Sequence, residues 1–242
     1  MVFHIILIFL LKLYVFLYSM SFDEMLQVLM KKKKNSLSLQ PKHELNWTGV
    51  MNPRIPQSIT QSIAAKQAIL NNPDFLDRIQ QAADMIVTSL RGGGKIHFCG
   101  NGGSAADAQH LAAELSGRFY FDRPPLNAEA LHCNTSYLTA VGNDYGYDLI
   151  FSRLLRGTAK KGDVIVGIST SGNSKNILKA FEMAKEMGVK IIAMTGETGG
   201  KMKDFADILL NAASADTPRI QESHIMIGHI ICELVESEMF GK

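Results

Sequence analysis

The sequence predicts an α/β domain in which a five-stranded parallel sheet is flanked by helices. Short apolar runs alternate along the chain with amphipathic segments of helical spacing. One of these runs, residues 164–168, is continuously apolar, as expected for a strand buried on both faces. A glycine-rich turn at residues 100–103 joins another apolar run to a helical segment. Strands and helices that alternate in this way form a parallel sheet joined by right-handed crossovers.

The elements follow one another from residue 57 onward. Apolar stripes predict helices over residues 57–70 and 73–90, and Pro73 suits the start of the second. The glycines at 92–94 end that helix. The expected strands are residues 96–99, 127–131, 164–168, 190–194 and 208–211. Further helices are expected over residues 104–115, 134–141, 147–156, 175–187, 201–206 and 218–239.

The glycine turn and the helix after it form a candidate anion site. Glycine lets the backbone approach a ligand closely, and Ser104 is expected to cap the helix. The free N–H groups of a helix start attract anions. A rival interpretation is a dinucleotide fingerprint, since Gly100, Gly102 and Ala105 nearly satisfy its spacing. The absence of a carboxylate at the end of the second expected strand disfavours it.

Two helices carry candidate metal ligands or acid–base groups. His110 and Glu114 stand four residues apart, so both side chains lie on one helix face. On the last helix, Gln221 and His229 lie within about 80° of each other. The alternative is a structural role, in which these polar groups form hydrogen bonds inside a core or a subunit interface. If the helices meet, the four side chains form a nitrogen and oxygen site suited to Zn²⁺.

A second loop is rich in hydroxyl groups. Residues 169–174, Ser-Thr-Ser-Gly-Asn-Ser, follow the apolar strand 164–168 and lead into a helix. In open α/β sheets, ligands bind outside the carboxyl ends of the strands, where hydroxyls and helix N–H groups can hold a phosphate. The alternative is an ordinary serine-rich turn. Phosphate binding is favoured because the glycine turn opens at the same edge of the sheet.

Overall composition is that of a globular protein, with 46% hydrophobic and 20% charged residues. The net charge of +2 gives no argument for a nucleic-acid partner. Cys99, Cys133 and Cys232 are odd in number and lack CxxC spacing. This pattern is typical of reduced thiols, and we expect a cytoplasmic protein.

Residues 1–50 differ in pattern from the rest of the chain. Residues 2–20 are almost unbroken apolar sequence, near the ~20 residues that span a bilayer, but they lack the features of a signal peptide. The segment is a membrane anchor, a disordered extension, or upstream sequence read from an early start codon. We favour the last, with Met51 as the true start. Residues 1–50 are therefore assigned as a non-core segment and 51–242 as one domain, with a membrane contact expected only if 1–50 are present.

Five motifs in order make the chain from about residue 55 onward resemble the sugar-isomerase (SIS) domain family. Within that family it is most similar to the bacterial phosphoheptose isomerases, which act on sedoheptulose 7-phosphate. The motifs are Gly100 to Ala105, Gln109-His110 with Glu114, Gly142-Asn143-Asp144, Ser169 to Ser174, and Arg219 to Glu222 with His229.

The resemblance implies a three-layer fold, a homotetramer with active sites at subunit interfaces, and one Zn²⁺ per subunit. It implies conversion of D-sedoheptulose 7-phosphate to D-glycero-D-manno-heptose 7-phosphate, the first step of activated-heptose synthesis for lipopolysaccharide or other surface glycans. The matching zinc ligands are His110, Glu114, Gln221 and His229, and the matching catalytic pair is Glu114 and His229. The matching substrate-binding residues are Asn101, Gly102, Gly103, Glu114, Asn143, Asp144, Ser169, Thr170, Ser171, Ser174 and Gln221.

The chemistry of these side chains suits ketose–aldose interconversion, which needs a base at carbon and an acid at oxygen. We assign Glu114 to the carbon and His229 to the oxygens. One alternative is a non-catalytic SIS protein that binds the replication initiator. This alternative is disfavoured because such proteins lack the glutamate and the histidine that this chain has at positions 114 and 229. A sugar-phosphate sensor is disfavoured because no DNA-binding module precedes residue 51. A SIS isomerase of another sugar phosphate is disfavoured by His110 and Gln221.

Overall fold

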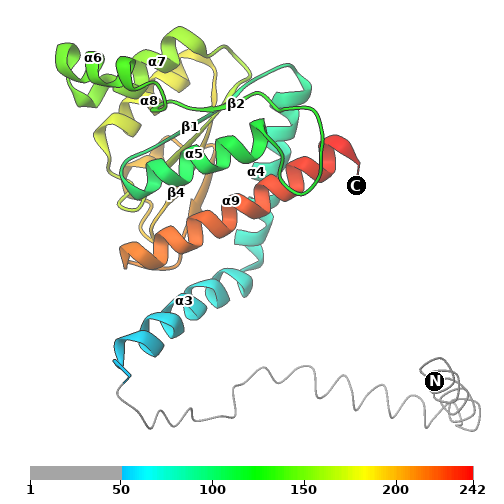
Figure 1. Ribbon diagram of the computed structural model, residues 1–242, viewed down its shortest axis with the longest axis vertical. Helices are drawn as coiled ribbons and strands as arrows, with labels where there is room; N and C mark the ends of the chain where they lie inside the picture. Colours follow the sequence, from blue (N-terminus) through cyan, green and yellow to red (C-terminus); the bar gives the residue numbers. More distant parts are fainter. Residues whose placement is uncertain (1–50, 242) are drawn as a thin grey trace, which may run out of the picture. The chain divides into compact units, whose positions relative to one another are not determined.

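The computed structural model describes residues 51–241, which contain a parallel sheet of five strands. The strand order is β2-β1-β3-β4-β5, so the chain begins near one edge and crosses to the other (Figure 1). The strands are β1 (Ile96–Gly100), β2 (Ala128–Ala130), β3 (Val164–Ser169), β4 (Lys190–Thr195) and β5 (Ile208–Asn211). All five lie where the sequence predicts them, which confirms the α/β class.

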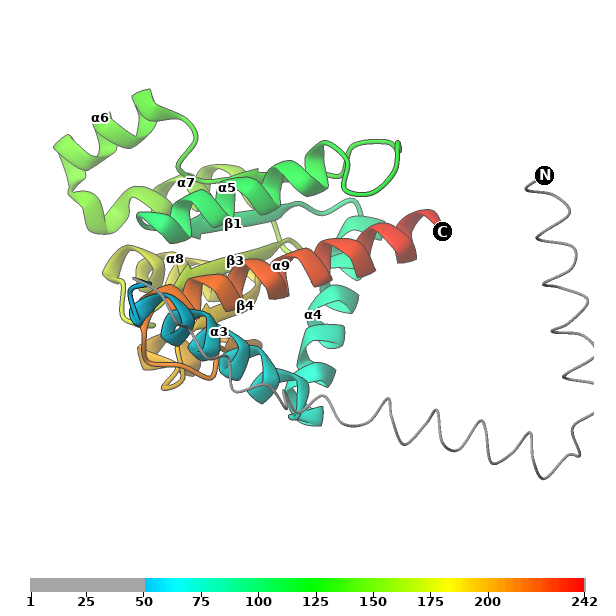
Figure 2. The same cartoon turned by 60° about the horizontal axis from the view of Figure 1, so that its bottom comes forward.

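Helices cover both faces of the sheet and produce three layers (Figure 2). One core joins the sheet to α4, α5 and α9, and a second joins the opposite face to α7 and α8. The helices are α3 (Arg54–Leu70), α4 (Pro73–Arg91), α5 (Gly103–Ser116), α6 (Thr135–Tyr145), α7 (Ile150–Thr158), α8 (Lys175–Met187) and α9 (Thr217–Phe240). Two 3₁₀ helices are η1 (Tyr147–Leu149) and η2 (Gly200–Asp204).

Burial on both faces explains why the strand sequences show no polar alternation. In β3, Val164 and Val166 pack into the core of α4, α5 and α9, whereas Ile165 packs against α7 and α8. Successive side chains of a strand point to opposite faces, so a sheet covered on both sides requires apolar residues at every position. The continuous run predicted to be a buried strand is therefore the central strand of the sheet.

The predicted helix cap at Ser104 is wrong. Helix α5 begins at Gly103 and its N-cap is Gly102, whose φ of +56° belongs to the left-handed region that favours glycine. Ser104 lies inside the first turn and is buried. The chain leaves β1 through a turn so tight that the helix starts before the serine. The helix therefore presents glycine backbone, not a serine side chain, at its first turn.

Three smaller differences concern element length. Strand β2 is shorter than the predicted 127–131, because only Ala128–Ala130 pairs with β1. The predicted helix 147–156 divides into η1 and α7, and the looser helix at 201–206 is the 3₁₀ helix η2. The interpretations of residues 1–50 lie outside the described residues. Within 51–241, no helix combines the length and apolar character that crossing a membrane requires.

A buried hydrogen bond between a histidine and an aspartate stabilises the edge of the sheet opposite the site. His97 Nε2 lies 3.2 Å from Asp163 Oδ2, and both side chains are inaccessible to solvent. Asp163 also accepts hydrogen bonds from the backbone N–H groups of Lys95 and Lys160. These contacts connect the starts of β1 and β3, which are neighbours in the sheet.

We predict that acid weakens the fold through His224 of α9. The side chain is fully buried, its Nε2 donates to the Thr195 carbonyl at 2.9 Å, and burial lowers its pKa to about 4. In the unfolded chain His224 takes up a proton near pH 6.5, whereas in the folded chain it does so only near pH 4. Stability is therefore complete above pH 6.5 and declines as the pH falls toward 4, by about 3 kcal/mol at most.

The measurement is urea unfolding of the wild type and of His224→Gln between pH 7.5 and 4.5. Glutamine cannot protonate, so the variant should lose part of the acid sensitivity. Burial also lowers the pKa of His97, so some sensitivity should persist in the variant. Identical pH profiles for the two proteins would contradict the assignment to His224.

Candidate metal and sugar-phosphate site

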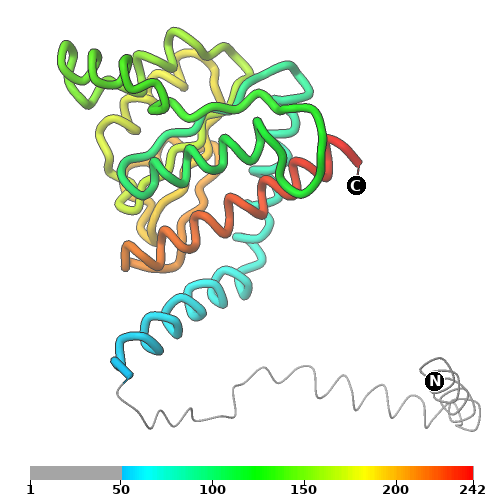
Figure 3. The backbone as a smooth tube through the Cα atoms, in the orientation of Figure 1, coloured from blue at the N-terminus to red at the C-terminus, as the bar shows by residue number. Residues whose placement is uncertain are grey.

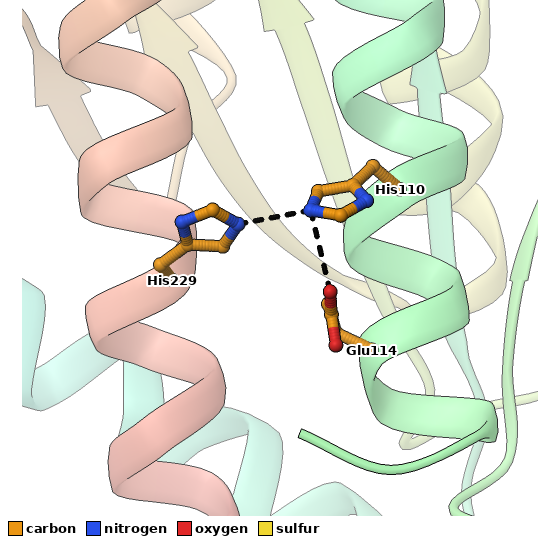
Figure 4. A group of neighbouring side chains, drawn as sticks. All are labelled: His110, Glu114 and His229. Carbon is orange, nitrogen blue, oxygen red and sulfur yellow. Dashed lines mark hydrogen bonds and ion pairs between the residues drawn. The ribbon is translucent and has the colours of Figure 1, made fainter. Parts of the chain in front are cut away.

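Helices α5 and α9 lie side by side on one face of the sheet, as the backbone trace shows (Figure 3). They bring together His110 and Glu114 from α5 and His229 from α9 (Figure 4). The Nε2 atoms of the two histidines are 3.0 Å apart, and His110 Nε2 is 3.3 Å from Glu114 Oε1. One ligand atom from each residue lies within 4.8 Å of the others. Three of the four predicted metal ligands therefore converge within one chain.

Gly228 explains how the two helices come so close. A Cβ atom built on Gly228 would lie 2.5 Å from Leu111 Cδ1, which is too short for any real contact. Leu111 follows His110 directly, and Gly228 precedes His229 directly. The absence of a side chain at this position thus allows the histidine rings to meet across the gap between the helices.

The loop between α5 and β2 lies beside the cluster and is held by a buried ion pair. Arg123 Nε lies 2.9 Å from Glu236 Oε1, and both side chains are 1% exposed. Glu236 also accepts the backbone N–H groups of Phe119 and Tyr120. Burial favours a higher pKa for the Glu236 carboxyl, but these hydrogen bonds and the Arg123 guanidinium together lower that pKa.

The same arginine fixes the end of α5. Its guanidinium donates to the carbonyl oxygens of Glu114 and Leu115. The Phe119 ring, on the loop held by this pair, lies 5.8 Å from the His229 ring. Hydrogen bonds from Arg123 and Glu236 to the backbone therefore fix the positions of Glu114 and of the Phe119 ring beside His229.

Asp107 is a neighbour of the cluster that the sequence analysis missed. It precedes His110 by three residues on α5, and burial raises the pKa of its carboxyl although His110 and His229 act to lower it. Its Oδ2 atom is buried and has no hydrogen-bond partner. The spacing of three residues before His110 was the available signal.

Gln221, the fourth predicted ligand, contacts the start of α5. Its amide nitrogen would be 2.3 Å from a Cβ built on Gly103, so it touches the start of α5. Gly103 precedes His110 by seven residues, about two helical turns. Arg219, two residues before Gln221, pairs with Glu222 at 2.7 Å and also donates to the Ser58 carbonyl of α3.

The hydroxyl-rich loop lies where the sequence places it, between β3 and α8. Ser169 Oγ is 2.8 Å from Ser174 Oγ and 3.4 Å from Ser171 Oγ, so three hydroxyls converge. Thr170 is half-buried, and its carbonyl accepts the Gly196 N–H group. Ser174 occupies the N-cap of α8 but makes no capping bond, so its hydroxyl faces the other serines.

The glycine loop lies next to this serine loop because β1 pairs with β3, with Gly100 opposite Ile168. The loop holds Asn101, Gly102 and Gly103, and both glycines are exposed. The Asn101 side chain is linked to Asn176 and to the Tyr147 hydroxyl, two residues that the sequence analysis did not single out.

Asn143 and Asp144 stand at the end of α6 and are exposed. Their side chains bond to each other at 2.8 Å, and no contact joins them to the histidine cluster. The structure therefore groups the predicted residues into the cluster of His110, Glu114 and His229, two adjacent loops and this separate pair.

Comparison with known proteins identifies the family. A family model for the SIS domain matches residues 64–196. A phosphoheptose isomerase of Mycobacterium tuberculosis is 54% identical over 181 residues, covering 75% of this chain and 92% of the relative. One from Sulfurimonas denitrificans is 52% identical over 191 residues, covering 79% and 98%. The chain belongs to the phosphoheptose isomerase family of SIS-domain proteins.

Solved phosphoheptose isomerases share the fold as well as the sequence. The structure from Neisseria gonorrhoeae gives a TM-score of 0.71 at 45% identity, covering 76% of this chain and 97% of that one. The structure from Francisella tularensis gives a TM-score of 0.73 at 38% identity, with the same coverage.

We predict that Gly228→Val separates α5 from α9. The new side chain would overlap Leu111, with a loss of about 1–3 kcal/mol in the free energy of unfolding. It would also move His229 away from His110 and weaken Zn²⁺ binding more than tenfold. Urea unfolding and a zinc titration measure both effects.

The matched control is Gly157→Val in α7, where a built Cβ meets nothing within 4 Å. It should change stability by at most about 0.5 kcal/mol and leave the zinc affinity unaltered. Wild-type zinc affinity in Gly228→Val would show that close helix contact does not set the metal cluster.

Proposed function

We propose that this protein interconverts D-sedoheptulose 7-phosphate and D-glycero-D-manno-heptose 7-phosphate. The observation that carries the proposal is the cluster of His110, Glu114 and His229 in a chain of the phosphoheptose isomerase family. A carboxylate and an imidazole in one open site supply the base and the acid that a ketose–aldose isomerisation requires. The product serves activated-heptose synthesis for lipopolysaccharide or another surface glycan.

Glu114 moves the proton between C1 and C2 of the open-chain sugar, and an enediol is the intermediate. Its side chain is 22% exposed, so a substrate can reach the carboxylate. His229 exchanges protons with the oxygens at C1 and C2 from the neighbouring helix. Because helices α5 and α9 carry these groups, both stand on rigid elements, which suits a reaction that depends on placement within an ångström.

The hydroxyl loop binds the phosphate at the other end of the sugar. The converging hydroxyls of Ser169, Ser171 and Ser174 lie before the N-terminus of α8, where backbone N–H groups favour an anion. Thr170 and the glycine loop residues Asn101, Gly102 and Gly103 complete the substrate contacts. Asn143 and Asp144 are also proposed substrate contacts. They reach the substrate either from a neighbouring subunit or by a movement of the end of α6 toward the site of the same subunit.

The donor set fits Zn²⁺. Two imidazole nitrogens and a carboxylate oxygen are typical zinc ligands, and tetrahedral zinc separates two ligand nitrogens by ~3.3 Å. The observed separation of the two Nε2 atoms is 3.0 Å. We propose Gln221 as the fourth ligand, since it also faces α5. Bound zinc would polarise the carbonyl and hydroxyl oxygens of the sugar.

The proposed assembly is a homotetramer with active sites at subunit interfaces, and the exposed apolar face of α3 supports a contact with another chain. Ile55, Ile59 and Ile63 recur every four residues and are 52%, 57% and 60% exposed. Large apolar side chains gathered on one helix face usually mark a protein contact. The three cysteines described in the structure, Cys99, Cys133 and Cys232, are all free thiols, which supports a cytoplasmic location.

The direct test is incubation of the purified protein with D-sedoheptulose 7-phosphate, with products identified by NMR. We predict that Glu114→Gln folds normally and lowers kcat by about 10²–10⁴, because the amide cannot accept the proton. Glu186→Gln, at an exposed position near the C-terminal end of α8, is the control and should keep full activity. A folded and active Glu114→Gln enzyme would refute the role of Glu114.

The metal prediction is one Zn²⁺ per chain. Elemental analysis after mild purification should find it, a chelator should abolish activity, and added Zn²⁺ should restore it. His229→Ala removes one of the ligand nitrogens and should lower the zinc content. Full activity in a metal-free protein would show that the cluster is not a zinc site of the reaction.

A further inference from the structure

A pair of asparagines joins the two loops of the site. Asn101 lies in the glycine loop after β1, and Asn176 is the second residue of α8, beyond the serine loop. The Asn101 Nδ2 donates to Asn176 Oδ1 at 3.0 Å, and the Asn176 Nδ2 donates to Asn101 Oδ1 at 2.8 Å. Two side-chain amides that bond reciprocally fix both the distance and the orientation of the segments that carry them.

Further contacts hold this pair in place. Asn176 is 3% exposed, and its Oδ1 also accepts the N–H group of Ile177. The hydroxyl of Tyr147, in η1, donates to Asn101 Oδ1 at 3.2 Å. The side-chain oxygen of Asn101 thus accepts from Asn176 of α8 and Tyr147 of η1, while its amide nitrogen donates back to Asn176. Three separate segments of the chain meet at one side chain.

We infer that Asn176 and Tyr147 are positioning residues that set the span between the glycine loop and the serine loop. This inference rests on the proposed function, in which the phosphate occupies the serine loop while the reacting carbons lie beside α5. A seven-carbon substrate must reach both at once, so the distance between the loops decides whether C1 and C2 meet Glu114. Binding energy from the phosphate then positions the reacting end.

Asn176 acts through Asn101 and not by touching the sugar, since its side chain is buried. A ligand that fills only the serine loop should therefore be indifferent to the pair. Inorganic phosphate is such a ligand. A role in positioning predicts that loss of the pair impairs the sugar phosphate and spares inorganic phosphate, whereas general damage to the fold would impair both.

The experiment compares wild type, Asn101→Ala, Asn176→Ala and the double variant. Each single variant should lower kcat/KM for D-sedoheptulose 7-phosphate about tenfold or more. The double variant should be no worse than the poorer single one, because the two side chains act as one unit. The dissociation constant of inorganic phosphate, measured by calorimetry, should stay within about twofold of the wild type.

Two further variants keep the test decisive if Asn176→Ala fails to fold. Asn101→Asp preserves the shape but sets a carboxylate oxygen against Asn176 Oδ1, and it should lower kcat/KM as the alanine variant does. Tyr147→Phe removes one exposed hydroxyl and should lower kcat/KM by a factor of about two to five. The control is Asn211→Ala, which loses an amide hydrogen bond to the Glu197 carbonyl at the end of β5 and should keep full activity.

If the wild type is active, two results would overturn the positioning role and leave the proposed function intact. One is a double variant whose loss equals the product of the single losses. The other is a phosphate dissociation constant that rises in parallel with the loss in kcat/KM. A wild-type protein without activity on D-sedoheptulose 7-phosphate would instead overturn the proposed function, and the positioning role with it.

Discussion

The pairing of β1 with β3 is the constraint on which the site depends. The register sets Gly100 opposite Ile168, so the turns that leave these two strands open side by side at one edge of the sheet. One turn carries the exposed glycines before α5, and the other carries the converging serine hydroxyls before α8. A slip of one residue would exchange the side chains of β3 between its two faces, and the packing of each face against its own helices prevents it.

The contact between α5 and α9 is the second determinant. The sheet orients α5, but the cluster of His110, Glu114 and His229 exists only because α9 approaches without a side chain at Gly228. The buried pair of Arg123 and Glu236 then fixes the loop between α5 and β2 against α9. The ligand groups thus stand on two helices, and the surrounding hydrogen bonds fix the positions of their backbones.

Most of the architecture could be predicted because its signals are local. Apolar runs revealed the strands, four-residue spacing revealed His110 and Glu114, and the order of the motifs revealed the family. The cap at Ser104 was predicted wrongly because the tightness of the turn at Gly102 is a property of the folded backbone. The reciprocal bond between Asn101 and Asn176 joins residues 75 positions apart and leaves no periodic trace.

The position of α9 in the chain has a consequence for how the molecule is made. This helix follows every other described element, yet it supplies Ile227, Ile231 and Val235 to the core on one face of the sheet. During synthesis, α4, α5 and that face of the sheet must wait with their apolar surfaces uncovered until α9 emerges. His229 joins His110 and Glu114 at the same moment, so a nascent chain brings these three side chains together only when its fold is closed.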